Sequence, residues 1–269
     1  MTLFHLFILA IVQGITEFLP ISSSAHLVLL HELGTSPDTD AIALDVAVHL
    51  GSIVAVCLYF RADFARILTG TGQLLRGSLG SPESFLAFAL AVATVPALLL
   101  GGILTLTGWI DLLRNATVIG WMMIIFGILL WWAHRTFPER RLAQEWRLKD
   151  ALIMGLWQAV ALIPGVSRSG ITMTAGRMLG FERHEAARLA MLMSIPITLA
   201  SSGYLLLRLP GQPLDADLLW QLSLGAVLAF FAAYAALALM MRFLHLVSFT
   251  PYVIYRVILG ALLLLIAYS

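Results

Sequence analysis

The sequence QGITEFLPISSSAH, from Gln13 to His26, interrupts a long apolar stretch with polar and charged side chains. Residues 3–33 are long enough to cross a bilayer as a helix, which takes about 20 apolar residues. However, Glu17 lies in the middle of this stretch and Pro20 breaks it. Irregular backbone at membrane depth is tolerated only where it is buried in protein or lines a wet cavity. We therefore predict a re-entrant helix–loop–helix hairpin rather than a plain span.

A second interruption, PGVSRSGIT from Pro164 to Thr172, has the same character. It lies inside the apolar region 151–179 and places Arg168 among glycine, serine and threonine. The same argument about backbone at membrane depth applies. We predict a second re-entrant hairpin here.

The rest of the chain has the composition of a membrane protein. Of its 269 residues, 60% are hydrophobic and 12% are charged, and the charged fraction is about half of average usage. The net charge of +1 provides no basic footprint for nucleic acid. Six stretches approach the length of a span: Ala41–Phe60, Ser84–Leu106, Ala116–Ala133, Ala187–Leu207, Leu218–Met241 and Tyr252–Tyr268. Within them, small residues predict helix packing at Gly101, Gly102, Gly120 and Gly127.

The two interruptions resemble each other. Aligned on their prolines, Leu19–Ser23 matches Ile163–Ser167, and a glutamine precedes each proline by six or seven residues. Each hairpin is followed by three spans, an odd number, so the second hairpin enters from the opposite side. This is the pattern of an inverted-topology repeat whose broken helices meet near the midplane.

We therefore predict an all-α polytopic membrane protein with six transmembrane helices and two re-entrant hairpins. Residues 1–269 form one membrane domain, with repeat halves at approximately 1–133 and 150–269. A basic loop, 134–149, joins the halves. When the hairpins re-enter, the arginine-rich loops all fall on one side, which the positive-inside rule makes cytoplasmic. Both termini then face outward.

The first interruption contains candidate metal ligands. Glu17 is an ionisable residue in an apolar stretch, and such residues are costly and usually functional. Gln13 lies one helical turn earlier, on the same face. Carboxylate and amide oxygens are hard ligands that suit Mg²⁺ or Ca²⁺. The alternative is a carboxylate that is merely hydrogen-bonded inside the bundle.

Three serines follow the break, at the predicted start of a helix. Ser22, Ser23 and Ser24 can cap that helix, and its free N–H groups can hold an anion. Ser23 is also a possible nucleophile if a base lies nearby. His26, on the same helix face as Ser23, could be that base, an acid for the leaving group or a nucleophile itself, or it could be structural.

The second interruption has the residues of a phosphate site. Arg168 is a guanidinium in an apolar context, and a phosphate matches its two-pronged geometry. The structural alternative is a buried ion pair between Arg168 and Glu17, which would also bring the two motifs together. Further contacts to phosphate are predicted for Gly165, Ser167, Ser169 and Thr172. Elsewhere, His49 and Asp45 could extend the site, although a local hydrogen-bonded pair is the favoured interpretation, and Arg256 is interpreted as an anchor at the interface or inside the bundle.

Both motifs resemble the two signatures of the undecaprenyl-diphosphate phosphatase family linked to bacitracin resistance, and the resemblance covers essentially the whole chain. The first signature more usually has glycine where this chain has Ala25. The resemblance implies a divalent-metal-dependent enzyme of the bacterial plasma membrane, in an interlocked inverted-repeat fold that is often dimeric. The enzyme would convert undecaprenyl diphosphate to the monophosphate and recycle the lipid carrier of cell-wall synthesis. By position, Glu17 would bind metal, Arg168 would grip the diphosphate and Ser23 would be the leading nucleophile candidate.

Two other classes of function remain to be weighed against a lipid-diphosphate phosphatase. Inverted repeats with broken helices are common in transporters, so a polyprenyl-phosphate flippase could use the same site. A purely structural bundle would leave Glu17 and Arg168 without a reason to be buried. Within the phosphatase hypothesis, the attacking atom could belong to Ser23, His26 or an activated water.

Overall fold

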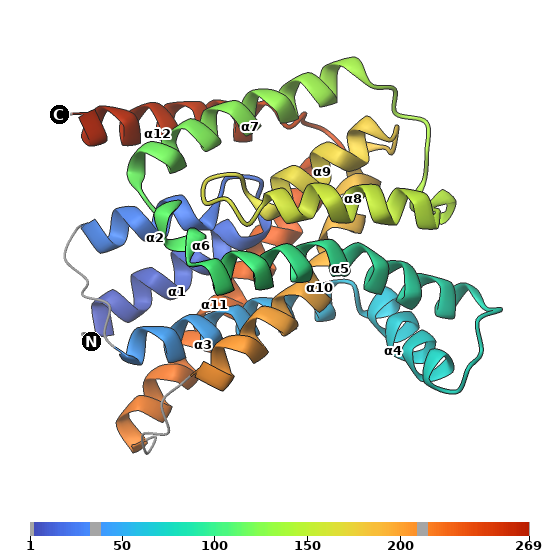
Figure 1. The fold of residues 1–269 in the computed structure, drawn as a ribbon, viewed down its shortest axis with the longest axis horizontal. Helices are drawn as coiled ribbons and strands as arrows, with labels where there is room; N and C mark the ends of the chain where they lie inside the picture. The colour runs from blue at the N-terminus through green and yellow to red at the C-terminus, as the bar shows by residue number, and fades with distance from the viewer. Residues whose placement is uncertain (1–2, 33–38, 209–214, 269) are drawn as a thin grey trace.

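A computed structural model describes residues 3–32, 39–208 and 215–268 of the chain, and these segments are almost entirely helical (Figure 1). The first half contains α1 (Leu3–Phe18), α2 (Ser23–Glu32), α3 (Thr39–Tyr59), α4 (Arg61–Leu75), α5 (Pro82–Thr107), α6 (Trp109–Leu112) and α7 (Ala116–Thr136). The second half contains η1 (Ala143–Glu145), α8 (Leu148–Val160), α9 (Arg168–Met178), α10 (Arg183–Arg208), α11 (Ala216–Phe243) and α12 (Thr250–Tyr268).

The helices confirm a multi-pass, all-α membrane protein. Among the described residues, five helices are long and apolar enough to cross a membrane, namely α5, α7, α10, α11 and α12. A sixth span results if α3 and α4, which meet at an angle of 99°, are taken together. Five of the six predicted spans correspond to α5, α7, α10, α11 and α12, and the remaining one, Ala41–Phe60, corresponds to α3, the first helix of the bent pair.

Helix α4 was not anticipated. Its apolar side chains Leu68 and Leu75 are exposed, whereas Asp63 and Gly70 are buried against the bundle. A Cβ atom on Gly70 would collide with the backbone carbonyl of Glu83, so α4 and α5 pack in close contact. Polar and small residues recur among the leucines of α4, so the helix contains no apolar stretch long enough to be recognised as a span from hydropathy.

Both predicted hairpins are present and enter from opposite ends of the molecule. In Figure 1, α1 runs from the left towards the centre and α2 returns, whereas α8 runs from the right and α9 returns. The N- and C-termini lie at the same, left-hand end. Each hairpin breaks near its proline, between Phe18 and Ser23 and between Val160 and Arg168. The arrangement is the inverted repeat that the sequence predicts.

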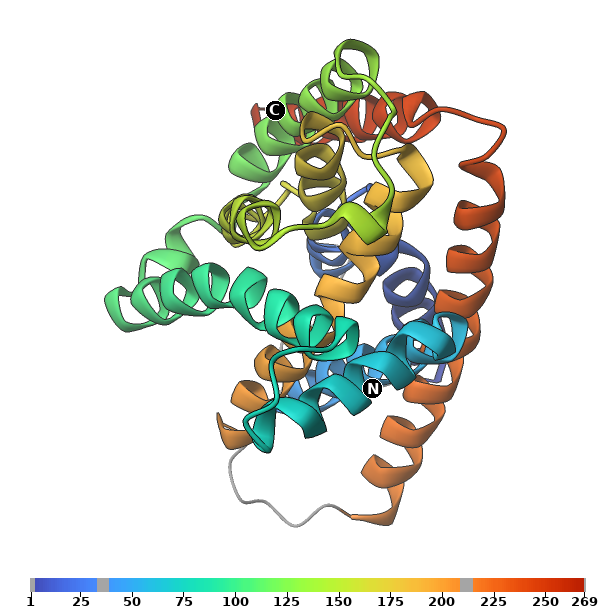
Figure 2. The ribbon, with the colours of Figure 1, turned by 90° about the vertical axis from the view of Figure 1, so that its right-hand side faces the viewer.

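The two halves are interlocked. The first helix of each hairpin packs on a span of the other half, α1 on α11 and α8 on α5. Close approach depends on glycine in both cases: a Cβ on Gly14 would lie 2.6 Å from the carbonyl oxygen of Ala229. A Cβ on Gly155 would collide with the carbonyl of Ala93. Helices α7 and α12 also lie side by side, as Figure 2 shows from the right-hand end.

Two of the four predicted packing glycines are confirmed. Gly120 faces the backbone of Gly260 on α12, and Gly127 faces the side chain of Arg256. The prediction was wrong for Gly102, whose Cβ would meet nothing within 4 Å, and Gly101 makes only an ordinary contact with Leu162. Both lie near the end of α5, where a small residue gives no advantage in packing.

Candidate functional site

The two breaks have the same backbone conformation. Ser22 and Ser167 are the two non-glycine residues with positive φ in the described chain, at 70° and 68°. Each immediately precedes a helix, and each hydroxyl contacts the serine two residues further on, at 3.0 Å in the first half and 3.2 Å in the second. The proline-based alignment, which paired Ser23 with Ser167, is therefore wrong by one residue. Backbone conformation pairs Ser22 with Ser167, and Gln13 then pairs with Gln158.

The breaks also touch each other near the centre of the molecule (Figure 1). The Ser169 hydroxyl donates to the carbonyl of Leu19 over 2.9 Å. The backbone N–H of Gly165 donates to the Ser24 hydroxyl over 3.1 Å. These bonds join residues that lie 150 and 141 positions apart in the sequence, and so bring the two motifs together.

Glu17 is the centre of the site. Its side chain is 8% exposed and forms an ion pair with Arg168. Its Oε2 atom accepts hydrogen bonds from the Gln13 amide at 2.7 Å and from the Ser23 hydroxyl at 3.3 Å. The predicted shared face of Gln13 and Glu17 is confirmed, and so is the pairing of Glu17 with Arg168.

Arg168 has partners that sequence reasoning missed. It donates to the hydroxyl of Thr198 and, over 3.3 Å, to the carbonyl of Ser194, both on α10. The guanidinium is therefore held between the first hairpin and a span of the second half. Thr198 and Ser194 are small polar residues in an apolar helix, and their role depends on a tertiary contact that the local sequence does not encode.

His49 extends the site, which was the less favoured of its two interpretations. Its Nδ1 does bond the backbone oxygen of Asp45, at 2.6 Å. Its Nε2, however, lies 3.0 Å from the amide nitrogen of Gln13 and 3.7 Å from the carboxylate of Glu17. Because a carbonyl can only accept, Nδ1 carries the proton, and Nε2 accepts a hydrogen bond from the Gln13 amide N–H. His49 thus orients the glutamine from helix α3.

His26 is not directed at Ser23. Its Nδ1 bonds the backbone oxygen of Ser22 at 2.8 Å, and its Nε2 lies 2.6 Å from the hydroxyl of Tyr255 on α12. The rings of His26 and Tyr255 are parallel, with centroids 5.7 Å apart. The partner of the Ser23 hydroxyl is Glu17 instead. Tyr255 was not anticipated, since nothing in its local sequence distinguishes it from an interfacial tyrosine.

Hydroxyl groups of the second motif are buried and mostly engaged. Ser167 accepts the N–H of Gly170 at 3.2 Å and so caps α9. Thr172 donates to the carbonyls of Arg168 and Ser169, at 2.8 and 3.1 Å. The Thr172 hydroxyl therefore stabilises the first turn of α9. Its predicted effect on phosphate would act through that turn rather than by direct contact.

The protein oxygens that this site offers to a divalent cation are those of Gln13 and Glu17. The Oε1 atom of Gln13 is buried and accepts no hydrogen bond among the described residues. Gln13 lies one helical turn from Glu17, and its amide nitrogen rather than Oε1 bonds the Glu17 carboxylate. No group of three or more His, Cys, Asp or Glu side chains in the described chain could hold a metal by itself. Mg²⁺ commonly binds through one or two carboxylates plus substrate phosphates and water, which matches two protein oxygens at this site.

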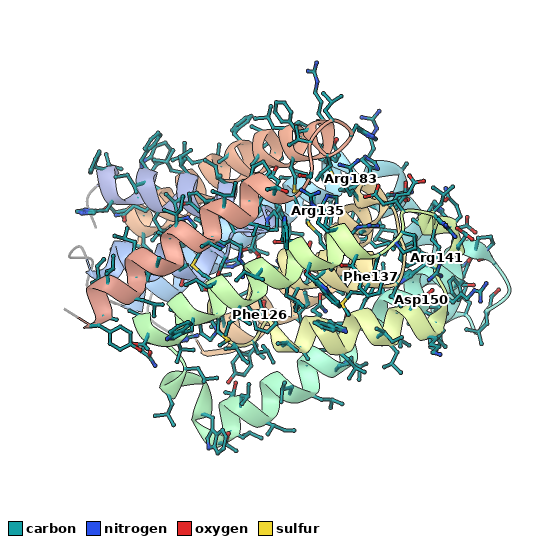
Figure 3. The ribbon with its side chains drawn as sticks, turned by 90° about the horizontal axis from the view of Figure 1, so that it is seen from above. Phe126, Arg135, Phe137, Arg141, Asp150 and Arg183 are labelled. Carbon is teal, nitrogen blue, oxygen red and sulfur yellow. The ribbon has the colours of Figure 1, made fainter. Side chains whose placement is uncertain are left out.

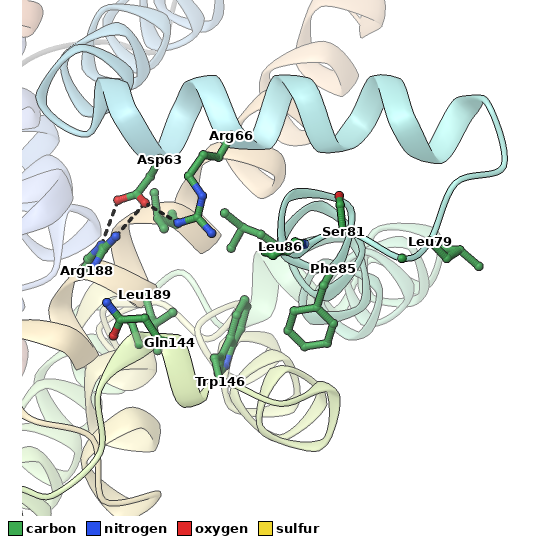
Figure 4. A pocket seen from close by; sticks show the side chains of 14 residues that line it. Asp63, Arg66, Leu79, Ser81, Phe85, Leu86, Gln144, Trp146, Arg188 and Leu189 are labelled. Carbon is green, nitrogen blue, oxygen red and sulfur yellow. Dashed lines mark hydrogen bonds and ion pairs between the residues drawn. The ribbon is translucent and has the colours of Figure 1, made fainter.

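A cavity of about 500 Å³ lies elsewhere, between α4, α5, η1 and α10 (Figure 4). At its edge Arg188 donates to both carboxylate oxygens of Asp63, at 2.7 and 2.8 Å. This pair ties α4 to α10. Basic side chains gather towards the end of the molecule opposite the termini. Figure 3 shows Arg135, Arg141 and Arg183 on that side.

Comparison with known proteins agrees with this geometry. Residues 6–262 match the family described as Bacitracin resistance protein BacA. The chain is 56% identical to an undecaprenyl-diphosphatase of Dinoroseobacter shibae and 53% identical to one of Roseobacter denitrificans, with the whole of both chains covered in each case. It is 46% identical to an undecaprenyl-diphosphatase of Hahella chejuensis, over all of this chain and 99% of the relative. With two broken hairpins joined at Glu17 and Arg168, and a match over nearly its full length, the chain belongs to the bacitracin resistance protein BacA family.

Proposed function

We propose that this protein hydrolyses undecaprenyl diphosphate to undecaprenyl phosphate and inorganic phosphate. The relatives that match over the full chain carry the name of this activity. The observation that carries the proposal is the hydrogen bond from the Ser23 hydroxyl to Glu17, at 3.3 Å. A hydroxyl and a carboxylate within hydrogen-bond reach are the pair that nucleophilic catalysis needs. Arg168 lies against the same carboxylate.

The step begins at Ser23. Its Oγ attacks the terminal phosphorus and its proton passes to the Glu17 carboxylate. As the new O–P bond forms, the bond from phosphorus to the bridging oxygen breaks, and its electron pair stays on that oxygen as lipid monophosphate. Water then attacks the phosphoserine, phosphate leaves and the serine oxygen recovers a proton. Charge on the transferring group must be stabilised throughout, because positioning and electrostatics dominate phosphoryl transfer.

Arg168 and the start of α9 stabilise this charge. The guanidinium has five N–H donors, and those bound to Glu17, Ser194 and Thr198 leave others for phosphate oxygens. The N–H of Gly170 is capped by Ser167, but the N–H groups of Arg168 and Ser169 have no acceptor within the helix, which suits them to an anion. Gln13 and Glu17 are the residues that would hold a divalent cation, Mg²⁺ or Ca²⁺, and the cation would neutralise part of the diphosphate charge.

Purified protein and a polyprenyl diphosphate provide the test. We expect metal-dependent phosphate release by the wild type, and Arg168→Ala to lower kcat/KM by roughly 10²–10³-fold, as loss of one preorganised donor typically does. Ser23→Ala should abolish a trapped phosphoserine, whereas Ser223→Ala, a serine that bonds only within α11, should not. Wild-type rates in Arg168→Ala would refute the assignment of the site.

A polyprenyl-phosphate transporter is not favoured, because transport needs no hydroxyl directed at a carboxylate. The same protein in sealed vesicles distinguishes the two. In these vesicles a phosphatase releases inorganic phosphate from the lipid. A transporter instead moves intact lipid phosphate between leaflets and releases no inorganic phosphate.

The setting of the enzyme follows from the same reasoning. We propose that the end bearing Arg135, Arg141 and Arg183 faces the cytoplasm of a bacterium, with both termini outward from the inner membrane. Residues 1–269 act as one domain of two halves, approximately 1–133 and 150–269. A homodimer is compatible with the exposed apolar faces of the spans, and light scattering of the purified protein tests it.

A further inference from the structure

Arg256 on α12 is a fully buried cation, with 0% of its surface exposed. All the polar partners found for it are backbone carbonyls. Two belong to the second break, Gly165 at 3.0 Å and Val166 at 2.9 Å, and one to the first break, Pro20 at 3.5 Å. The remaining two lie on α7, at Met122 and Met123. One side chain therefore joins both breaks and the helix beside them.

The surroundings of Arg256 are shaped for this side chain. A Cβ on Gly170 would lie 2.8 Å from the Nη1 atom of Arg256, and a Cβ on Gly127 would lie 3.3 Å from the Cβ of Arg256. Two neighbouring helices, α9 and α7, thus have glycine where the arginine passes. A long, charged side chain enclosed in this way is expensive to bury, and such residues in membrane proteins are usually functional.

The contacts fix the direction of a peptide group at the site. A trans peptide is planar, so its C=O and N–H point in opposite directions. Because Arg256 holds the carbonyl of Val166, the N–H of Ser167 points away from Arg256. Ser167 has φ of 68° and immediately precedes α9. Its N–H therefore lies next to the free N–H groups of the first turn of α9, a position that suits an anion. Arg256 therefore holds the N-terminus of α9 from behind.

The positive charge of Arg256 also favours an anion at the start of α9. Arg168 is neutralised by Glu17, whereas the contacts found for Arg256 offset its charge only with carbonyl dipoles. Charges interact more strongly in a low-dielectric interior than in water. A cation behind the break thus increases the attraction of the site for a diphosphate.

We propose that Arg256 is a positioning residue for the diphosphate substrate. It holds the two breaks in register and directs the N–H groups at the start of α9, without itself contacting the substrate. This inference rests on the proposed phosphatase activity, and it assigns to α12 a part in the reaction that neither signature motif contains.

The chain offers a matched control in Arg177. This arginine is also 0% exposed and also donates to backbone carbonyls, those of His134, Phe137, Pro138 and Phe181. It lies in the last turn of α9, at the opposite end of that helix from the site. Replacing either arginine by lysine keeps a positive charge but removes the planar fork that binds several carbonyls.

We expect Arg256→Lys and Arg177→Lys both to lower the melting temperature in detergent, and only Arg256→Lys to impair turnover. Per folded molecule, Arg256→Lys should lower kcat on a polyprenyl diphosphate by roughly ten- to a hundredfold and weaken inhibition by orthovanadate. Arg177→Lys should keep kcat within about twofold of the wild type. These margins correspond to the effect of misplacing a preorganised donor rather than deleting it.

Equal loss of activity in the two variants, in proportion to their folded fraction, would overturn the proposal. So would a wild-type kcat in Arg256→Lys. If Arg256→Lys does not fold, Gly127→Ala provides a milder displacement of the arginine, with Gly102→Ala as its control. Absence of phosphate release by the wild type would instead refute the proposed function, so the two failures are distinguishable.

Discussion

At the scale of single residues, His26 is fixed by its two hydrogen bonds. The carbonyl of Ser22 can only accept, so the Nδ1 atom of His26 carries a proton. In the neutral ring Nε2 then accepts the hydroxyl proton of Tyr255 over 2.6 Å. Tyr255 therefore sets the orientation of an imidazole that lies three residues from the proposed nucleophile.

Replacing that tyrosine should have a small and measurable effect. Tyr255→Phe removes one neutral hydrogen bond, worth about 1 kcal/mol, so we expect kcat to fall by roughly two- to tenfold. Tyr268→Phe is the matched control, since Tyr268 is also on α12 but contacts Trp121 instead. Steady-state phosphate release checks both variants. An unchanged kcat in Tyr255→Phe would show that the hydrogen bond between Tyr255 and His26 has no part in turnover.

The neighbours of Glu17 show which parts of the site could be predicted. Gln13 shares its helix face, and an unpaired glutamate in an apolar stretch demands a cation such as Arg168, so local sequence and charge balance were sufficient. For His49 the local interpretation was favoured over a place in the site, because its bond to the carbonyl of Asp45 is local, whereas its contact with Gln13 through the other ring nitrogen is not. The role of Arg256 could not be decided from the sequence, because its partners are backbone carbonyls and these cannot be recognised from a pattern of side chains.

At the scale of elements, the two hairpins depend on glycine where they meet the other half. Residue Gly155 on α8 lies against the backbone of Ala93 on α5, and the added methyl of Gly155→Ala would collide there. Overpacking of this kind costs about 1–3 kcal/mol, so we expect a lower melting temperature. Gly102→Ala, on α5 itself, adds a methyl group in open space and should leave the melting temperature unchanged or raised.

Thermal unfolding in detergent, followed by light scattering or tryptophan fluorescence, compares these two variants. Equal melting temperatures would mean that α8 and α5 separate easily. The hairpins themselves were predictable from sequence, because proline and polar residues interrupt otherwise apolar stretches. Their register was not: the prolines are offset by one residue relative to the turns, and only the positive φ of Ser22 and Ser167 reveals it.

At the scale of the whole molecule, the distribution of charge predicts the orientation in the membrane. A variant with Cys57→Ala has no other cysteine, so single cysteines can then report sidedness. We expect Thr107→Cys, at the C-terminal end of α5, to react with an impermeant maleimide in intact cells. Gln144→Cys, among the basic loops, should react only after the inner membrane is permeabilised. The reverse pattern would contradict the positive-inside assignment.

The equivalence of Ser22 and Ser167 has a consequence for the origin of the chain. Two segments with one backbone conformation, inserted in opposite senses, are what duplication and fusion of a single ancestral gene would leave. In that register Glu17 corresponds to Leu162 and Ser23 to Arg168. In an ancestor with identical halves the contact between these two positions would occur twice, whereas today Glu17 pairs with Arg168 and the equivalent positions hold Leu162 and Ser23, so the single ion pair records a division of labour that arose after fusion.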